Sequence, residues 1–87
     1  MTLAPHILIG LRPDQAALIV GRPKRISEEP PATVWSYGDK TCGLRIFFYP
    51  ELKTETPKAL AVTVDTKNPS PAARGACFAH IRAHAHG

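Results

Sequence analysis

Apolar and polar residues alternate most clearly in the middle of the chain, between Thr41 and Tyr49. One parity consists of Cys42, Leu44, Ile46 and Phe48, and the other consists of Gly43, Arg45, Phe47 and Tyr49. A period of two places alternate side chains on opposite faces of a β-strand. The pattern therefore predicts a strand whose aliphatic face points into the core.

Two further segments have the composition of strands. Residues 33–37 (TVWSY) are rich in β-branched and aromatic side chains and end at Gly38-Asp39, a turn signal. Residues 59–65 alternate, with Leu60, Val62 and Val64 expected to face inward. Together with the central strand, these segments predict a three-stranded antiparallel meander.

Two helices are predicted to flank the strands, one over residues 11–20 and one over residues 71 to about 84. Pro13 and Pro71 suit the first helical position, and Ser70 suits the position that caps the second helix. Gly21 followed by Pro23 ends the first helix. Residues 23–31 are expected to form a polar connection.

The fold class is therefore α+β: a helix, a three-stranded antiparallel β-meander and a C-terminal helix packed on one sheet face. A chain of 87 residues has room for a single domain with one core. Within it, residues 1–9 are expected to be an N-terminal extension and residues 85–87 a flexible, histidine-containing tail. The predicted core consists of Leu18, Leu44, Ile46, Phe48, Leu60, Val62, Val64 and Ile81.

Composition and charge narrow the range of functions. The hydrophobic content of 44% is typical of a folded domain, and the net charge of +4 comes from scattered basic residues with one short cluster at Arg22, Lys24 and Arg25. This predicts a weak peripheral contact with anionic membrane surfaces.

No apolar run reaches the length of about 20 residues that a membrane span needs. No signal peptide pattern is visible after Met1, so export would require a signal preceding it.

The two cysteines are positioned to meet. Cys42 belongs to the inward parity of the central strand, and Cys77 lies on the apolar side of the second helix with Ile81. A disulfide between them would close a loop of about 35 residues and stabilise the domain by about 3–4 kcal/mol. It would also imply an oxidising compartment. The alternative is a pair of buried free thiols that behave as small hydrophobic residues.

The C-terminal histidines offer an alternative use of Cys77. On a helix, Cys77, His80 and His84 share one side, and His86 follows, so a thiolate and imidazoles could converge on Zn²⁺. No second ligand cluster accompanies them, and a solvated histidine-rich tail explains them as well. The sequence therefore predicts no metal site, with His80, His84 and His86 as weak candidates.

The outward-facing residues of the central strand form the candidate partner-binding surface. Arg45, Phe47 and Tyr49 combine aromatic rings with a guanidinium, as protein interfaces do. Trp35 and Tyr37 either join this surface or face the core. No paired catalytic groups and no glycine-rich phosphate loop are found, so we expect a protein that is not an enzyme and needs no cofactor.

Short motifs in the first two-thirds of the chain resemble the BamE family, also called SmpA/OmlA, of small envelope lipoproteins. They are GLRPDQA at residues 10–16, VGRP at 20–23 and WSY at 35–37, over a match that covers residues 10–65. The segment 35–49 with the late Cys77 also looks like uncharacterised α-proteobacterial lipoprotein-like proteins that keep two cysteines. The resemblance implies an exported, non-enzymatic accessory protein that binds a protein partner in the periplasm or at the outer membrane. Without export, the protein would be cytoplasmic.

A nucleic-acid-binding module is the alternative from another class, because double-stranded-RNA-binding domains share the order α-β-β-β-α. Those domains contact phosphates with a lysine cluster at the start of the second helix. Here the corresponding segment, residues 71–77, carries only Arg74. We therefore expect no nucleic-acid partner.

Overall fold

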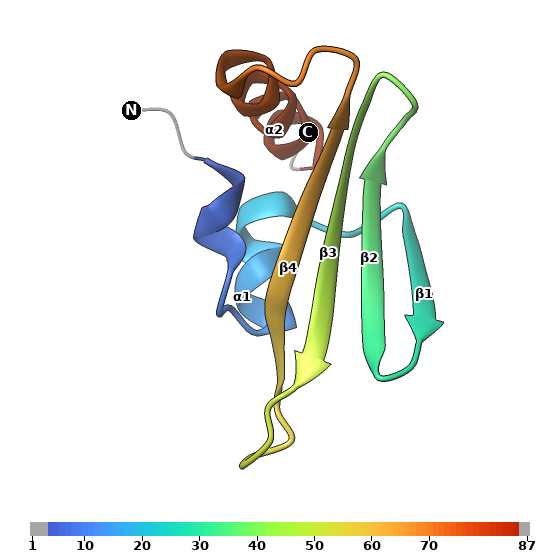
Figure 1. Cartoon of the computed structure of the whole chain (residues 1–87), viewed down its shortest axis with the longest axis vertical. Helices are drawn as coiled ribbons and strands as arrows, with labels where there is room; N and C mark the ends of the chain where they lie inside the picture. The colour runs from blue at the N-terminus through green and yellow to red at the C-terminus, as the bar shows by residue number, and fades with distance from the viewer. Residues whose placement is uncertain (1–3, 86–87) are drawn as a thin grey trace.

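A computed structural model describes residues 4–85 of the chain as a four-stranded antiparallel sheet with its helical segments on one side (Figure 1). The strands lie in the order β1-β2-β3-β4. The α+β prediction, with an antiparallel sheet and two α-helices, is confirmed, and the sheet has one strand more than predicted. The elements are η1 (Pro5–Leu8), α1 (Pro13–Val20), β1 (Arg25–Glu29), β2 (Ala32–Gly38), β3 (Cys42–Pro50), β4 (Pro57–Thr66) and α2 (Pro71–Ala85).

The additional strand, β1, lies within the segment expected to be a polar connection. It pairs antiparallel with β2, so that Arg25 lies opposite Ser36 and Ser27 lies opposite Val34. Because β1 is an edge strand with mostly exposed residues, its pairing needs no apolar alternation. A pattern based on apolar residues therefore could not detect it.

The alternation along β3 is confirmed. Leu44, Ile46 and Phe48 are buried on the face that the helices cover. They form one core with residues from η1, α1 and α2, namely Leu8, Val20, Phe78 and Ile81. The aliphatic parity of a single strand thus correctly identified the inner face of the sheet.

The inward set predicted for β4 is wrong at Leu60, which is 59% exposed, while its neighbour Ala59 is fully buried. The cause is an irregularity in the pairing with β3. Phe47 pairs with Ala61 but Phe48 pairs with Ala59, so Leu60 is an extra residue in β4. Val62 and Val64, on the regular side of the irregularity, are partly buried and pack against the core as predicted.

Helix α1 begins and ends as predicted. The Arg12 backbone N–H donates to the Gln15 side-chain oxygen at 2.9 Å, and the Arg12 guanidinium bonds to Asp14 at 3.0 Å. This hydrogen bond lowers the pKa of Asp14. At the other end, Gly21 adopts a φ of 72°, which a glycine tolerates without steric cost.

The core position predicted for Leu18 in α1 is wrong. Leu18 is 80% exposed, and the buried residues are Ala16 and Val20, one helical turn apart. The small side chain of Ala16 allows the helix to lie close to the sheet. The rotation of the helix about its axis therefore decides which of its residues are buried, and the size of the side chains does not.

Most of the segment expected to be an N-terminal extension belongs to the folded domain. Leu8 of η1 is fully buried in the core. The Gly10 N–H donates to the Ala59 carbonyl at 2.7 Å, and the Ala59 N–H donates to the Leu11 carbonyl at 2.8 Å. These two bonds, made by the residues that directly follow the segment, join it to the edge of β4 that pairs with no described strand. Its residues show no periodicity because only one short turn packs against the sheet.

Candidate functional site

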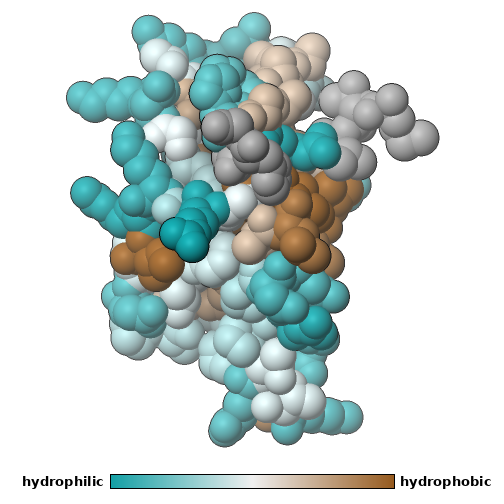
Figure 2. Space-filling view, turned by 180° about the vertical axis from the view of Figure 1, so that it is seen from behind, coloured by the Kyte–Doolittle hydropathy of each residue, from teal (hydrophilic) through white to brown (hydrophobic). Residues whose placement is uncertain are grey.

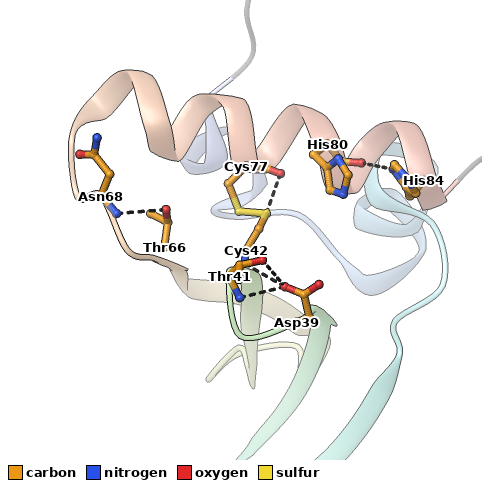
Figure 3. Close-up of a disulfide and its surroundings, with 8 residues drawn as sticks. All are labelled: Asp39, Thr41, Cys42, Thr66, Asn68, Cys77, His80 and His84. Atoms are coloured by element: carbon orange, nitrogen blue, oxygen red, sulfur yellow. Dashed lines mark hydrogen bonds between the residues drawn. A yellow bond between two sulfur atoms is a disulfide. The ribbon is translucent and has the colours of Figure 1, made fainter.

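A disulfide joins the sheet to α2, as predicted. It links Cys42, the first residue of β3, to Cys77 in the middle of α2, with a Cα–Cα distance of 5.5 Å (Figure 3). Cys77 is buried, and Cys42 packs against the core. The bond fastens the helix to the face of the sheet that it covers.

The turn between β2 and β3 places Cys42 for this bond. One carboxylate oxygen of Asp39 accepts hydrogen bonds from the Thr41 N–H at 2.9 Å, the Thr41 hydroxyl at 2.8 Å and the Cys42 N–H at 3.1 Å. These bonds, that of the Thr41 hydroxyl above all, lower the pKa of Asp39. Gly38 has a φ of 80°, and a Cβ there would collide with the Cys42 carbonyl oxygen. The turn thus needs both a glycine and a side-chain acceptor.

The disulfide removes Cys77 from the candidate metal ligands. His80 and His84 remain together on α2, with ring centroids 4.0 Å apart, and His84 Nδ1 lies 3.0 Å from the His80 carbonyl oxygen. His86 lies outside the described residues. Within residues 4–85, no three histidine, cysteine, aspartate or glutamate side chains are grouped to hold a metal ion.

The three predicted partner-binding residues share the face of the sheet opposite the helices. Arg45, Phe47 and Tyr49 alternate with the buried residues of β3. Trp35 and Tyr37 lie on the other face, where the Trp35 ring meets the Phe48 ring edge to face at 4.9 Å. Of the two readings for these aromatic residues, packing against the core is therefore correct.

The antiparallel register arranges the open face in rows. One row consists of Arg25, Ser36, Arg45 and Thr63, and the next consists of Ser27, Val34, Phe47 and Ala61. Sequence reasoning missed Arg25 as a member of this face because β1 was not predicted, and a test pairing of residues 25–29 with β2 would have been the signal for it. Val34 lies in the predicted strand 33–37 and shares the parity of Ser36, but it is only 2% exposed.

Contacts within the open face hold Arg45 in place. Its Nε lies 3.5 Å from Asp65 Oδ2, and its guanidinium carbon lies 5.8 Å from the centroid of the Phe47 ring. Phe47 is half-buried, although no described helix covers it. A guanidinium beside an aromatic ring can accept a partner's carboxylate while the ring offers apolar surface.

The opposite face, which the helices cover, is turned toward the viewer in Figure 2. Figure 2 shows hydrophobic side chains there in separate areas between polar ones. In the described part of the chain, the large exposed apolar residues are Ile9, Leu18, Ile26, Leu52 and Leu60. They belong to different elements, so we do not take them together as a site.

Comparison of this chain with protein-family models, curated proteins and solved structures found no match. Among the described residues, no helix is both long enough and apolar enough to cross a membrane. No polar or charged residue in that part of the chain is buried. The function is therefore inferred from the arrangement of this chain's own residues.

Proposed function

We propose that this chain is a non-enzymatic, protein-binding accessory module of the bacterial envelope, of the BamE/SmpA/OmlA kind. The open sheet face around Arg45, Phe47 and Tyr49 is its binding surface. The observation that carries the proposal is the division of the sheet: every described helix lies on one face, and the other face presents aromatic and basic side chains in ordered rows.

The chemistry of the rows specifies the kind of partner. Arg25 and Arg45 lie in one row, separated by Ser36, and Asp65 neutralises only part of their charge. In the adjacent row, Phe47 offers an apolar ring. A fitting partner is a protein surface that brings carboxylates to the arginine row and an apolar side chain to Phe47. Such pairing gives both orientation and affinity.

The disulfide supports the part of the proposal that concerns the compartment. Structural disulfides persist in oxidising environments such as the periplasm and are rare in the cytosol. Cys42 and Cys77 join two elements of a small core, which is where such a bond stabilises most. The resemblance of the short motifs to envelope lipoproteins favours the same compartment.

Site-specific photo-crosslinking tests the binding face. A photoreactive phenylalanine analogue replaces Phe47 in one variant and the exposed Leu18 on α1 in a matched control, and both are expressed in the native cell. We expect position 47 to give one protein adduct, identified by mass spectrometry as an envelope protein, and position 18 to give none.

Charge reversal completes this test. Arg45→Glu should remove the adduct at position 47, whereas Arg74→Glu, a charge reversal at an exposed residue of α2, should retain it. Adducts at position 18 alone, adducts with nucleic acid, or identical adducts at both positions would overturn the proposal.

A further inference from the structure

Two features of the sequence that the sheet face does not use meet in the folded chain. Arg22 and Lys24, which follow α1, and the histidines of α2 line a common hollow of about 350 Å³. Its charged or titratable lining residues are Arg22, Lys24, Tyr37, Asp39, His80 and His84. Figure 3 shows the two histidines on the last turns of α2, beyond the disulfide, with Asp39 on the turn below.

The fixed charges of the hollow favour a negative ligand. Arg22 and Lys24 are two cations against the one carboxylate of Asp39, and that carboxylate is engaged with the backbone and hydroxyl of its own turn. The Lys24 ammonium donates to the Gly38 carbonyl at 3.4 Å. In the described part of the chain, Arg22 has no hydrogen-bond or ion-pair partner. A guanidinium without a partner is a ready donor for a planar or tetrahedral oxyanion.

The histidine pair adds donors on the other wall. The carbonyl of His80 can only accept, so Nδ1 of His84 is the donor in their 3.0 Å contact. This leaves Nε2 of His84 and the ring of His80 for a ligand. The rings lie 4.0 Å apart, so an anion that contacts both is stabilised further when they are protonated.

A divalent metal ion fits these surroundings less well. In the described chain, no group of three or more histidine, cysteine, aspartate or glutamate side chains could hold a metal ion, so the two imidazoles lack a third such ligand. The nearby Arg22 and Lys24 would repel a cation. Structural zinc sites use four ligands and catalytic ones at least three. The same side chains that disfavour a metal ion favour an oxyanion.

We propose that the hollow between the α1–β1 connection and the end of α2 binds a small oxyanion of the phosphate or sulfate type through Arg22, Lys24, His80 and His84. This site is independent of the open sheet face and of the proposed function. The anion is either free or the phosphoryl group of a larger molecule, because both present the same tetrahedral oxygens.

NMR titration with sulfate tests the site directly. We expect the ring signals of His80 and His84 to shift and saturate together, while those of His6, which lies on η1, stay in place. Free phosphate and O-phosphoserine are then compared. Tighter binding of the phosphate ester identifies a phosphoryl group on a larger molecule, and equal binding identifies the free anion.

A pair of arginine variants separates a site from general attraction to a basic protein. Arg22→Gln should weaken sulfate binding about tenfold, the usual effect of losing one charge-assisted hydrogen bond. Arg74→Gln, which removes an exposed arginine elsewhere, should leave it unchanged. Unfolding curves check that the variants fold. Equal weakening in both arginine variants, or no saturation, would overturn the proposal.

The pH dependence provides a second readout. Sulfate keeps both negative charges at mildly acid pH, whereas an imidazole becomes positive when it is protonated, so sulfate affinity should rise as pH falls. The other charged or titratable groups that line the hollow are Arg22, Lys24, Tyr37 and Asp39. His80→Asn with His84→Asn should abolish the rise, and His6→Asn should not. Zinc binding at the pair without sulfate binding would contradict the assignment.

Discussion

The two faces of the sheet differ most clearly at two consecutive phenylalanines of β3. Phe48 is 1% exposed and meets the ring of Trp35 under the helices. Phe47 points to the other face and lies beside the Arg45 guanidinium. The same residue type therefore has two environments, and the difference comes from which face the helices cover. The covered face holds the fold together, and the open face is the surface that we propose binds a partner.

The largest expected effect tests this difference directly. Phe48→Ala should lower the free energy of unfolding by about 3–5 kcal/mol, because it removes a large buried ring and leaves a cavity. Phe47→Ala should lower it by about 1 kcal/mol, as an average substitution does. Urea denaturation of both variants gives the comparison, and Phe48→Leu should fall between them if Phe48→Ala does not fold. Equal losses at both positions would mean that the open face is also core.

The disulfide belongs to the covered face and should have the next largest effect. Reducing the bond between Cys42 and Cys77 should lower the free energy of unfolding by about 3–4 kcal/mol, because the unfolded chain regains freedom over the loop between them. Denaturation with and without reductant measures this. The double variant Cys42→Ala/Cys77→Ala should unfold at the same denaturant concentration in both conditions. Intact mass should show resistance to alkylation, and two alkylatable thiols would refute the bond.

Tyr37 connects the covered face to the end of α1, and its loss should have a moderate effect. Its hydroxyl donates to the Gly21 carbonyl at 2.8 Å, so Tyr37→Phe should cost about 0.5–1.5 kcal/mol in denaturation experiments. Tyr49→Phe, on the open face, is the matched control and should cost less. Equal costs would contradict a structural role for the bond.

The same tyrosine predicts a response to alkaline pH. Burial raises the pKa of Tyr37, so above about pH 10 the unfolded chain loses a proton that the folded chain keeps. This component of stability is complete below that pH and is lost as the pH rises. Alkaline unfolding of Tyr37→Phe should therefore be less steep than that of the wild type. Identical profiles would show that burial of Tyr37 does not contribute.

The smallest effect is expected at Leu18, on the outer side of the covering helix. Leu18→Gln should change the free energy of unfolding by no more than about 0.5 kcal/mol, as exposed substitutions do. Val20→Ala, on the buried side of the same helix, should cost clearly more. Thermal unfolding of the pair measures the difference. A large loss at Leu18 would mean that α1 packs with a different rotation.

Local patterns predicted the parts of the fold that depend on local periodicity. The parity of β3 placed Ile46 inside and Phe47 outside, and helical phase brought Cys77 toward Cys42, so the disulfide was predictable. The exposure of Leu60 was not predictable, because one unpaired residue in β4 reverses the parity beyond it. The connection that contains β1 has no apolar alternation to read. The anion site was also invisible, since Arg22 and His84 lie in segments far apart in the sequence.

The sequence by itself determined the α+β class, the strand that forms the centre of the core and the pairing of its two cysteines. These follow from side-chain alternation and helical phase, which act over a few residues. Only the tertiary structure decided the edge strand, the rotation of α1 and the burial of Leu8. These depend on hydrogen bonds and packing between distant segments, such as the bonds that join Gly10 and Leu11 to Ala59. A pattern along one segment contains no record of the segment against which it will pack.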